Sequence, residues 1–431
     1  MTTLSLPLEL ASEVINCLNS KDAISFARTN KQKFQDACRS DFGYRVTRPV
    51  FICEVFDSKK RYSKRLSVIG HFACFIVQSI DELSLLPEYT KKIVFEELFN
   101  QRINKQLTCF KKLTHVIFSD KFNQSVDKLE LPDSLTHLEF GRAFDNPIDK
   151  LRLPDSLTYL EFGSCFDQPV DHLASQTLTH LIFGNRFDHP VNFGQGNINC
   201  PSLTHLTLGL YARHSVNFMD MHLCESLTHL RLFDNFSQPV DKLRLPSSLT
   251  HLTFGDVFYH PVDKLKLPDS LTHLEFGKWF NQPVDELKLP LSLTHLKFGN
   301  TFNRAIDNLK LPPSLTHLEF GIQFNQPVDN LKLPNSLLHL ELGCAFNQPV
   351  DNLKLPDSLT HLTFSSWFDQ SVDKLKLPDS LEYLDFGCEF SQPVDNLKLP
   401  SSGSLVRLYF PLGFSQPLDK LVLPPFLIDF H

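Results

Sequence analysis

Histidine recurs at one position of a repeated pattern, and imidazole can bind metal ions or change its charge near neutral pH. Written once, from Leu267 to Leu289, the pattern reads LPDSLTHLEFGKWFNQPVDELKL. The histidines are His115, His137, His180, His205, His229, His251, His273, His295, His317, His339 and His361, with Tyr159, Tyr383 and Arg407 in the same register. Because each lies on a separate predicted strand, the row forms no tetrahedral ligand set. We expect neutral, stacked imidazoles on a half-buried sheet face, which acid should destabilise.

Acidic and basic residues form two further rows. The aspartates are Asp127, Asp149, Asp171, Asp241, Asp263, Asp285, Asp307, Asp329, Asp351, Asp373, Asp395 and Asp419, and the lysines are Lys266, Lys288, Lys310, Lys332, Lys354, Lys376 and Lys398. A general acid and a general base need different environments, whereas identical repeats supply identical ones. The sequence also shows no Gly-rich phosphate loop and no paired nucleophile and base. We therefore predict no enzyme, no cofactor and no metal site, and rows that offset each other's charge.

Phenylalanine defines the period of the pattern. Successive members are 22 residues apart (for example 280 − 258) at Phe258, Phe280, Phe302, Phe324, Phe346, Phe368 and Phe390. A fixed period of this size is typical of stacked-repeat proteins. Fifteen coils are counted when the series includes Phe99, Phe122, Phe144, Phe166, Phe187, Ala212, Phe236 and Phe414. The coil at Ala212 follows a longer loop, which is either functional or a decayed repeat.

One coil begins with a predicted strand. Leu271, Leu274 and Phe276 have the LxxLxL spacing of a leucine-rich-repeat strand. His273 and Glu275 flank Leu274, so strand alternation directs them away from the core.

The rest of the coil turns back without a helix. Gly277 ends the strand, Phe280 points inward, and Asn281 to Pro283 form a corner in which we expect Asn281 to bond its own backbone. A second apolar side is expected from Val284, Leu287 and Leu289. One coil cannot bury enough apolar surface to offset the conformational entropy that its residues lose on folding, so coils must stack.

Composition excludes several classes of protein. The 431 residues carry 42 basic and 49 acidic side chains, a net charge of −7, which argues against a nucleic-acid or membrane-surface binder. The sequence contains no run of 18 apolar residues, so we predict no membrane span. The opening MTTLSLPLELASEV lacks the basic start of a signal peptide. The ten cysteines form no CxxC pair, so we expect free thiols in a reducing compartment.

Residues 1–50 differ from the repeats and predict short helices. Leu10, Val14, Ile15 and Leu18 follow helical spacing, and a second helix is expected after Asp22. The predicted organisation is a helical domain at 1–50, a linker or cap at 51–74, the solenoid at 75–424 and the end of the stack at 425–431.

The N-terminal stretch resembles an F-box. The opening Leu6-Pro7, the acidic Glu9 and Asp22 before an apolar pair carry the resemblance. It implies docking on a Skp1-like adaptor protein of a cullin-based ubiquitin ligase. The partner-binding residues that it implies are Leu6, Pro7, Leu8, Glu9, Leu10, Val14, Ile15, Leu18, Asp22, Ile24 and Phe26. The alternative is a helical cap that shields the first coil.

The repeat resembles the FNIP family, a relative of leucine-rich repeats. The segment named for Phe-Asn-Ile-Pro usually reads Phe-Asn-Gln-Pro here, as at Phe280 to Pro283. An F-box with FNIP repeats is typical of amoebae and of the giant viruses that infect them. The resemblance implies a non-catalytic substrate-recognition adaptor in the cytoplasm, or in the host cytoplasm if the protein is viral. The alternative is an interaction scaffold whose N-terminal helices only cap the solenoid.

The expected fold is therefore mainly β: a leucine-rich-repeat-like parallel β-solenoid of about fifteen 22-residue coils with a small N-terminal α-helical F-box-like domain. Binding of an unknown target protein is expected where the repeat varies and outward-facing charges or aromatic rings occur. The candidate target-binding residues are Arg231, His273, Glu275, Trp279, Lys297 and Trp367. Neutral drift at exposed positions is the alternative explanation of this variation.

Overall fold

A computed structural model describes residues 74–431, except for residues 190, 192, 194–197, 210–221, 233–235, 237–238, 402, 426 and 431. The chain divides into two compact units, Met1–Gln168 and Pro169–His431. The F-box-like helices predicted in residues 1–50, with all their candidate partner-binding residues, lie outside the described part, as do most of the predicted linker and the loop around Ala212. These expectations stay predictions.

The described part of the first unit consists of short parallel strands and one short helix. Each strand pairs in register with the next along the chain, from β1 with β2 to β4 with β5. The elements are β1 (Cys74–Val77), α5 (Ile80–Leu83), β2 (Lys92–Phe95), β3 (His115–Ile117), β4 (His137–Glu139) and β5 (Tyr159–Glu161).

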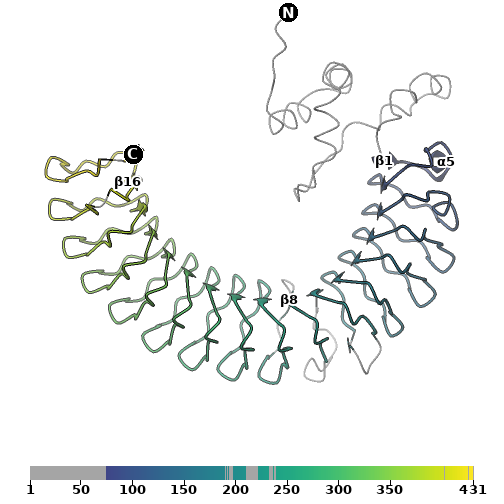
Figure 1. Ribbon diagram of the computed structural model, residues 1–431, viewed down its shortest axis with the longest axis horizontal. Helices are drawn as coiled ribbons and strands as arrows, with labels where there is room; N and C mark the ends of the chain where they lie inside the picture. The colour runs from purple at the N-terminus through teal and green to yellow at the C-terminus, as the bar shows by residue number, and fades with distance from the viewer. Residues whose placement is uncertain are drawn as a thin grey trace, which may run out of the picture. The chain divides into compact units, whose positions relative to one another are not determined.

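The second unit repeats the same parallel pairing in its described residues, and its strands line the inner edge of a curved row of coils (Figure 1). Equivalent residues pair directly, as His273 does with His295. The strands are β6 (His180–Ile182), β7 (His205–Leu208), β8 (His229–Leu232), β9 (His251–Thr253), β10 (His273–Glu275), β11 (His295–Lys297), β12 (His317–Glu319), β13 (His339–Glu341), β14 (His361–Thr363), β15 (Tyr383–Asp385), β16 (Arg407–Tyr409) and β17 (Asp429–Phe430).

The mainly β, parallel solenoid expected from the sequence is confirmed in the described residues. Fourteen strands, β3 to β16, begin at the repeated histidine or at the tyrosine or arginine that replaces it. The solenoid therefore has about fourteen coils rather than the fifteen counted from phenylalanine. The extra coil, at Phe99, follows strand β2, which begins at Lys92 and departs from the pattern.

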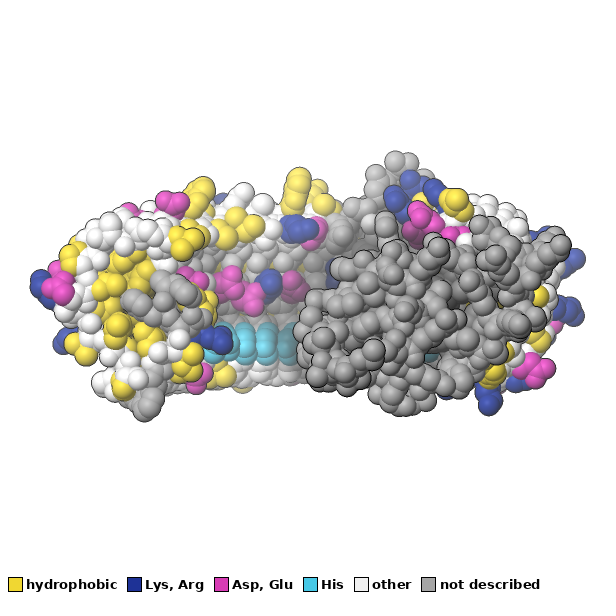
Figure 2. All heavy atoms as spheres, turned by 90° about the horizontal axis from the view of Figure 1, so that it is seen from above, with side chains coloured by type: hydrophobic (Ala, Val, Ile, Leu, Met, Phe, Trp, Pro, Cys, Tyr) yellow, Lys and Arg dark blue, Asp and Glu magenta, His cyan; other side chains and the backbone are white. Residues whose placement is uncertain are grey.

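Strand alternation places the repeated leucine inside and its neighbours outside. In β10, Leu274 is buried, His273 is half-buried and Glu275 is exposed. Figure 2 shows the resulting line of histidine side chains and, beside it, a parallel line of acidic and basic side chains. The outward direction predicted for the histidine row is confirmed.

Phenylalanine rings fill the inside of most of the described coils in two rows, and Leu208, Leu232 and Leu342 replace the first ring in their coils. Phe276 and Phe280 of one coil have ring centroids 4.1 Å apart. Phe280 stacks on Phe302 of the next coil at 6.0 Å with an interplanar angle of 5°, and Phe324 continues the row at 6.2 Å from Phe302. All four rings are buried, which confirms the predicted continuous rows. Stacked rings add about 0.5–1.5 kcal/mol per pair beyond the area that they bury.

The second apolar side differs in one residue from the prediction. Val284 and Leu287 are buried as expected, but Leu289 is only partly buried. The buried Pro290 fills the interior at this corner, so the preceding leucine lies at its edge.

Asparagine at the corner bonds the next coil and not its own backbone, so that prediction was wrong. Asn281 Oδ1 accepts a hydrogen bond from the Asn303 backbone N at 3.0 Å. Asn325 Oδ1 accepts two, from Asn347 N at 2.9 Å and Gln348 Nε2 at 3.0 Å. Parallel stacking brings the equivalent residue of the next coil within reach, and this satisfies an N–H that the strand ladder leaves unpaired.

Serine makes a second bond between coils at the opposite corner. Ser292 Oγ donates to the Leu271 carbonyl at 2.6 Å, and Ser314 Oγ donates to the Leu293 carbonyl at 2.7 Å. The leucine that follows Ser292 also donates its N–H to the Pro290 carbonyl at 3.1 Å. The repeated Leu-Pro-x-Ser-Leu segment is thus a turn that is bonded to the preceding coil.

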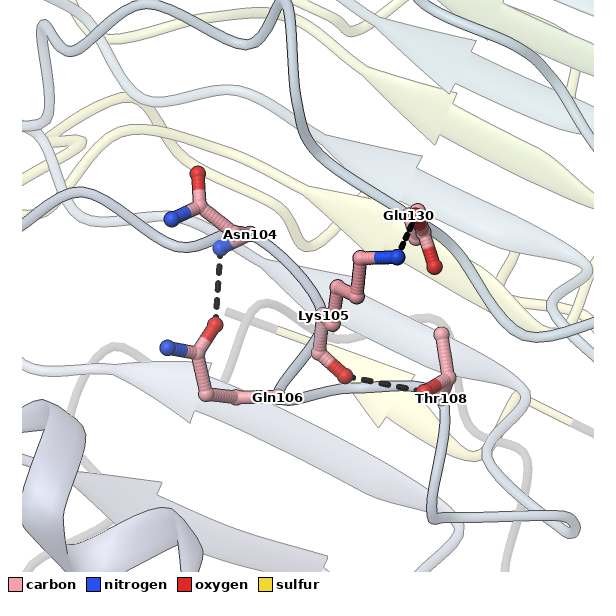
Figure 3. A network of polar contacts seen from close by, with 5 residues as sticks. All are labelled: Asn104, Lys105, Gln106, Thr108 and Glu130. Atoms are coloured by element: carbon pink, nitrogen blue, oxygen red, sulfur yellow. Dashed lines mark hydrogen bonds and ion pairs between the residues drawn. The ribbon is translucent and has the colours of Figure 1, made fainter.

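The first unit replaces part of the pattern with a local polar network (Figure 3). Lys105 Nζ lies 2.8 Å from Glu130 Oε1, and Thr108 Oγ1 donates to the Lys105 carbonyl at 2.9 Å. The Asn104 backbone N donates to Gln106 Oε1 at 2.7 Å, while its carbonyl accepts from Glu130 N at 2.7 Å. These bonds hold an irregular segment against the following coil.

We expect Phe324→Ala to lower the free energy of unfolding by about 3–5 kcal/mol, because it opens a cavity in a close-packed ring row. Thermal or urea unfolding measures the effect. Ile322→Ala is the matched control, since Ile322 is 49% exposed and its truncation should change stability by about 0.5 kcal/mol or less. Equal effects of the two substitutions would contradict the packing described above.

We expect Asn325→Ala to lower the free energy of unfolding by about 1–3 kcal/mol, because two donors of the next coil lose their acceptor. Asn325→Asp should retain most of the stability at neutral pH. Asp145 shows why: its Oδ1 accepts from Asp167 N at 3.0 Å and Gln168 Nε2 at 2.8 Å. Urea unfolding of both variants tests the expectation, and an Asp variant as unstable as the Ala variant would contradict it.

Candidate binding surface on the strand face

Stacked imidazoles form the centre of the candidate surface in the second unit. The His273 and His295 ring centroids lie 4.1 Å apart with an interplanar angle of 12°, and His229 and His251 lie 4.0 Å apart. The largest separation in this row is 4.3 Å, between His317 and His339. Strand pairing imposes this spacing, since neighbouring parallel strands lie about 4.8 Å apart.

Threonine fixes the orientation of these rings. Thr272 Oγ1 lies 3.1 Å from the Thr250 carbonyl and 2.8 Å from His273 Nδ1. A carbonyl can only accept, so the single hydroxyl hydrogen donates to it, and the hydroxyl oxygen accepts from Nδ1. Nδ1 therefore carries the proton, and Nε2 of the neutral ring is an acceptor.

The same pair of contacts recurs at neighbouring coils. Thr294 and Thr316 each donate to the preceding carbonyl at 3.0 Å and lie within 2.9 Å of the Nδ1 atom of the histidine that follows. His339 is the exception, because Leu338 precedes it. The sequence shows the Thr-His pair, but the bond to the previous coil became visible only in the structure.

Eight histidines of this row, from His180 to His339, have a lowered pKa and are neutral at neutral pH. Burial, followed by neighbouring histidines, lowers the pKa of His205, His251 and His317 from 6.5 to about 4. Burial likewise lowers the pKa of His273, with His295 as the next cause. A protonated row would place like charges about 4 Å apart on a partly desolvated face, which opposes protonation.

Most charged side chains on this strand face stand two positions after a histidine of the row. Lys297 Nζ lies 2.8 Å from Glu319 Oε2, and this hydrogen bond is the largest cause that raises the pKa of Lys297. Burial, then Glu319, raises the pKa of Glu341, and no ion pair to Glu341 occurs within the described ranges. Lys297 lowers the pKa of Glu341 only as the smallest of the causes, so this carboxylate is weakly compensated.

The structure brings some predicted target-binding residues together and separates others. Glu275 pairs with Lys297 across β10 and β11, next to His273. Trp279 and Trp367 are both 64% exposed, but they lie in the turns after β10 and β14.

Arg231 is exposed on β8, two strands before β10. Glu319 and Glu341, which occupy the same column of the repeat as Glu275 and Lys297, also lie on this surface, on β12 and β13.

Two members of the aspartate row make ordinary surface ion pairs with lysines that lie outside the lysine row. Lys374 Nζ lies 3.2 Å from Asp351 Oδ2, and Lys420 Nζ lies 3.3 Å from Asp395 Oδ2. Both lysine side chains are well exposed, so each pair contributes little to stability.

Other chemistry is limited in the part of the chain that the structure covers. No group of three or more His, Cys, Asp or Glu side chains is placed to hold a metal ion. Burial raises the pKa of Cys200 to about 11, so this thiol is a poor nucleophile. No helix in these residues is long and apolar enough to span a membrane.

Comparison with known proteins agrees with this geometry. The FNIP Repeat family model matches residues 122–165, 222–257, 258–301, 302–345 and 346–389. The chain therefore contains FNIP repeats. Each matched segment contains at least one strand of the row, although Leu232 takes the place of the first phenylalanine in 222–257.

The FNIP coils are also similar to solved leucine-rich-repeat structures. CroV588, a viral protein described as a novel circular LRR protein structure, is 37% identical with a TM-score of 0.60. The match covers 80% of this chain and 60% of the CroV588 chain, so this chain spans less than two thirds of that relative.

Two proteins of Listeria monocytogenes are more distantly similar. An internalin, InlF, is 15% identical with a TM-score of 0.40, over 75% of this chain and 87% of InlF. The functional domain of InlJ is 14% identical with a TM-score of 0.36, over 70% of this chain and 64% of that domain. None of the curated proteins compared with the chain matches it.

We expect the free energy of unfolding to fall as the pH falls from about 6.5 to about 4. Between these values the unfolded chain binds protons that the folded histidine row does not bind, so protons favour unfolding. Urea unfolding at several pH values measures the change, and His251→Gln should reduce the slope by removing one such group. Stability that stays constant between about pH 7.5 and 5 would rule out this linkage.

Proposed function

We propose that this FNIP-repeat protein is a non-catalytic interaction scaffold whose strand face binds a partner protein. The observation that carries the proposal is the in-register sheet of the second unit, where half-buried histidines lie beside exposed charges. The backbone groups within this sheet are paired, so its outward side chains can vary without loss of the fold. A rigid face with variable side chains suits recognition of another macromolecule.

Two exposed tryptophans support this proposal. Trp279 and Trp367 lie in turns of the same type, and their backbone N–H groups donate to the Asp256 and Cys344 carbonyls of the preceding coils. The turns are thus held in place while both indole rings face solvent. Tryptophan is enriched among the residues that contribute most to protein–protein binding.

We further propose that the protein is a substrate-recognition adaptor of a Skp1–cullin–F-box ubiquitin ligase, acting in the cytoplasm. The resemblance of the Leu6-Pro7 stretch to an F-box supports this role, and the FNIP coils would then present the target. In the second candidate function, residues 1–50 only cap the solenoid and recruit no ligase. The same resemblance favours the adaptor, because a simple cap does not require the Leu-Pro opening.

A pull-down with a purified Skp1-like protein tests the adaptor role. We expect the full chain to be captured and a Leu6→Ala/Pro7→Ala variant to lose at least about 90% of capture, because these residues open the resembling motif. The matched control is Trp279→Ala/Trp367→Ala, which should be captured like the unmodified chain. Absence of capture of every form would leave the scaffold and reject the adaptor.

A further inference from the structure

The strand face from β10 to β14 presents hydrogen-bond acceptors in a row. The Nδ1 atoms of His273, His295 and His317 are each within 2.9 Å of a threonine oxygen whose hydrogen is already donated to a carbonyl. Their Nε2 atoms are therefore acceptors, and no protein donor to them occurs in the described part of the chain. The adjacent rings are about 4 Å apart and nearly parallel, so their lone pairs do not converge on one metal ion.

Carboxylates extend this acceptor row on the same face. Glu275, Glu319 and Glu341 stand two residues after their histidines, and Lys297 is the one cation among the equivalent positions of β10 to β13. Lys297 is committed to Glu319 at 2.8 Å. The local balance is three negative charges against one positive charge, with Glu341 the least compensated.

This chemistry restricts the partner. An acidic segment would be repelled by the carboxylates. An apolar segment would displace water from the acceptors without supplying donors, which is unfavourable. A cationic segment rich in N–H donors satisfies both rows. Arginine fits better than lysine, because guanidinium presents five donors in a planar fork and is less strongly hydrated than ammonium.

We infer that the face from β10 to β14 binds an arginine-rich, extended segment of a partner protein, whose guanidinium groups donate to histidine Nε2 atoms and to Glu319 and Glu341. This inference rests on the proposed scaffold function and specifies its partner. Trp279 and Trp367 follow the first and last strands of this face and can stack on further guanidinium groups.

Fluorescence anisotropy with the full chain tests the inference. The probes are labelled eight-residue peptides of alternating serine and arginine, with lysine or glutamate replacing arginine in the matched peptides. We expect the arginine peptide to bind most tightly and the glutamate peptide not to bind. If the glutamate peptide bound at least as tightly as the arginine peptide, the inference that the face accepts hydrogen bonds from a cationic partner would be overturned. Equal binding of the lysine peptide would overturn the preference for arginine.

Charge-neutralising variants localise the site. Glu319→Gln/Glu341→Gln should raise the Kd of the arginine peptide about tenfold or more. Glu286→Gln/Asp357→Asn is the matched control, because both residues are exposed in turns outside the strands and the change in net charge is the same. Equal weakening by the two double variants would indicate a general charge effect and would overturn the site.

Thr316→Val tests the role of threonine as a positioning residue. It removes the acceptor of His317 Nδ1–H at nearly constant volume, so His317 can place its proton on Nε2, and peptide affinity should fall severalfold. Nitrogen-15 NMR of labelled histidine should show protonated Nδ1 in the unmodified chain and a shift of Nε2 alone on peptide binding. Unprotonated Nδ1 in the unmodified chain would overturn the acceptor row.

The Skp1 capture experiment separates failure of this inference from failure of the adaptor role, because it does not involve β10 to β14. Loss of peptide binding with retained capture rejects only the arginine-rich partner. Binding of the arginine peptide without capture supports the scaffold with this partner and rejects the ligase link.

Discussion

Register between successive coils is the constraint on which the rest of the structure depends. Parallel pairing joins each residue to its equivalent one repeat later, as at Leu274 and Leu296. Every position of the repeat therefore becomes a row of equivalent positions at one fixed spacing. A row is compatible with the fold only if its members tolerate that spacing. Phenylalanine rings stack on one another, and each asparagine side chain accepts a hydrogen bond from the backbone of the next coil. Histidines tolerate the spacing when they are uncharged.

The sequence predicted the features that depend on one coil alone. The LxxLxL spacing placed Leu274 inside and His273 outside, and the period of phenylalanine predicted the ring rows. The roles of Asn281 and Thr272 were not predictable in this way, because their partners are backbone groups 22 residues distant. An isolated Asn-Gln-Pro segment favours a local turn bond, and only the distance between stacked coils decides against it.

The candidate surface likewise combines features that one coil determines with features that depend on neighbouring coils. Exposure of Glu275, Lys297 and the two tryptophans follows from strand alternation and from the turn. The weak compensation of Glu341 arises from preceding coils, where Lys297 is already paired with Glu319 and the Glu319 charge raises the pKa of Glu341. Likewise, the proton position on His317 depends on a carbonyl of the preceding coil, which no property of the Thr-His pair alone reveals.

The same pairs of atoms form the bonds between coils from one coil to the next, and this has a consequence for how such a protein changes in length. Removing one complete 22-residue unit from the regular region leaves each asparagine, serine and threonine facing a partner of the same kind. At the level of the gene this corresponds to steps of 66 nucleotides (3 × 22). Recombination between misaligned repeats can therefore lengthen or shorten the strand face while conserving the bonds that hold it.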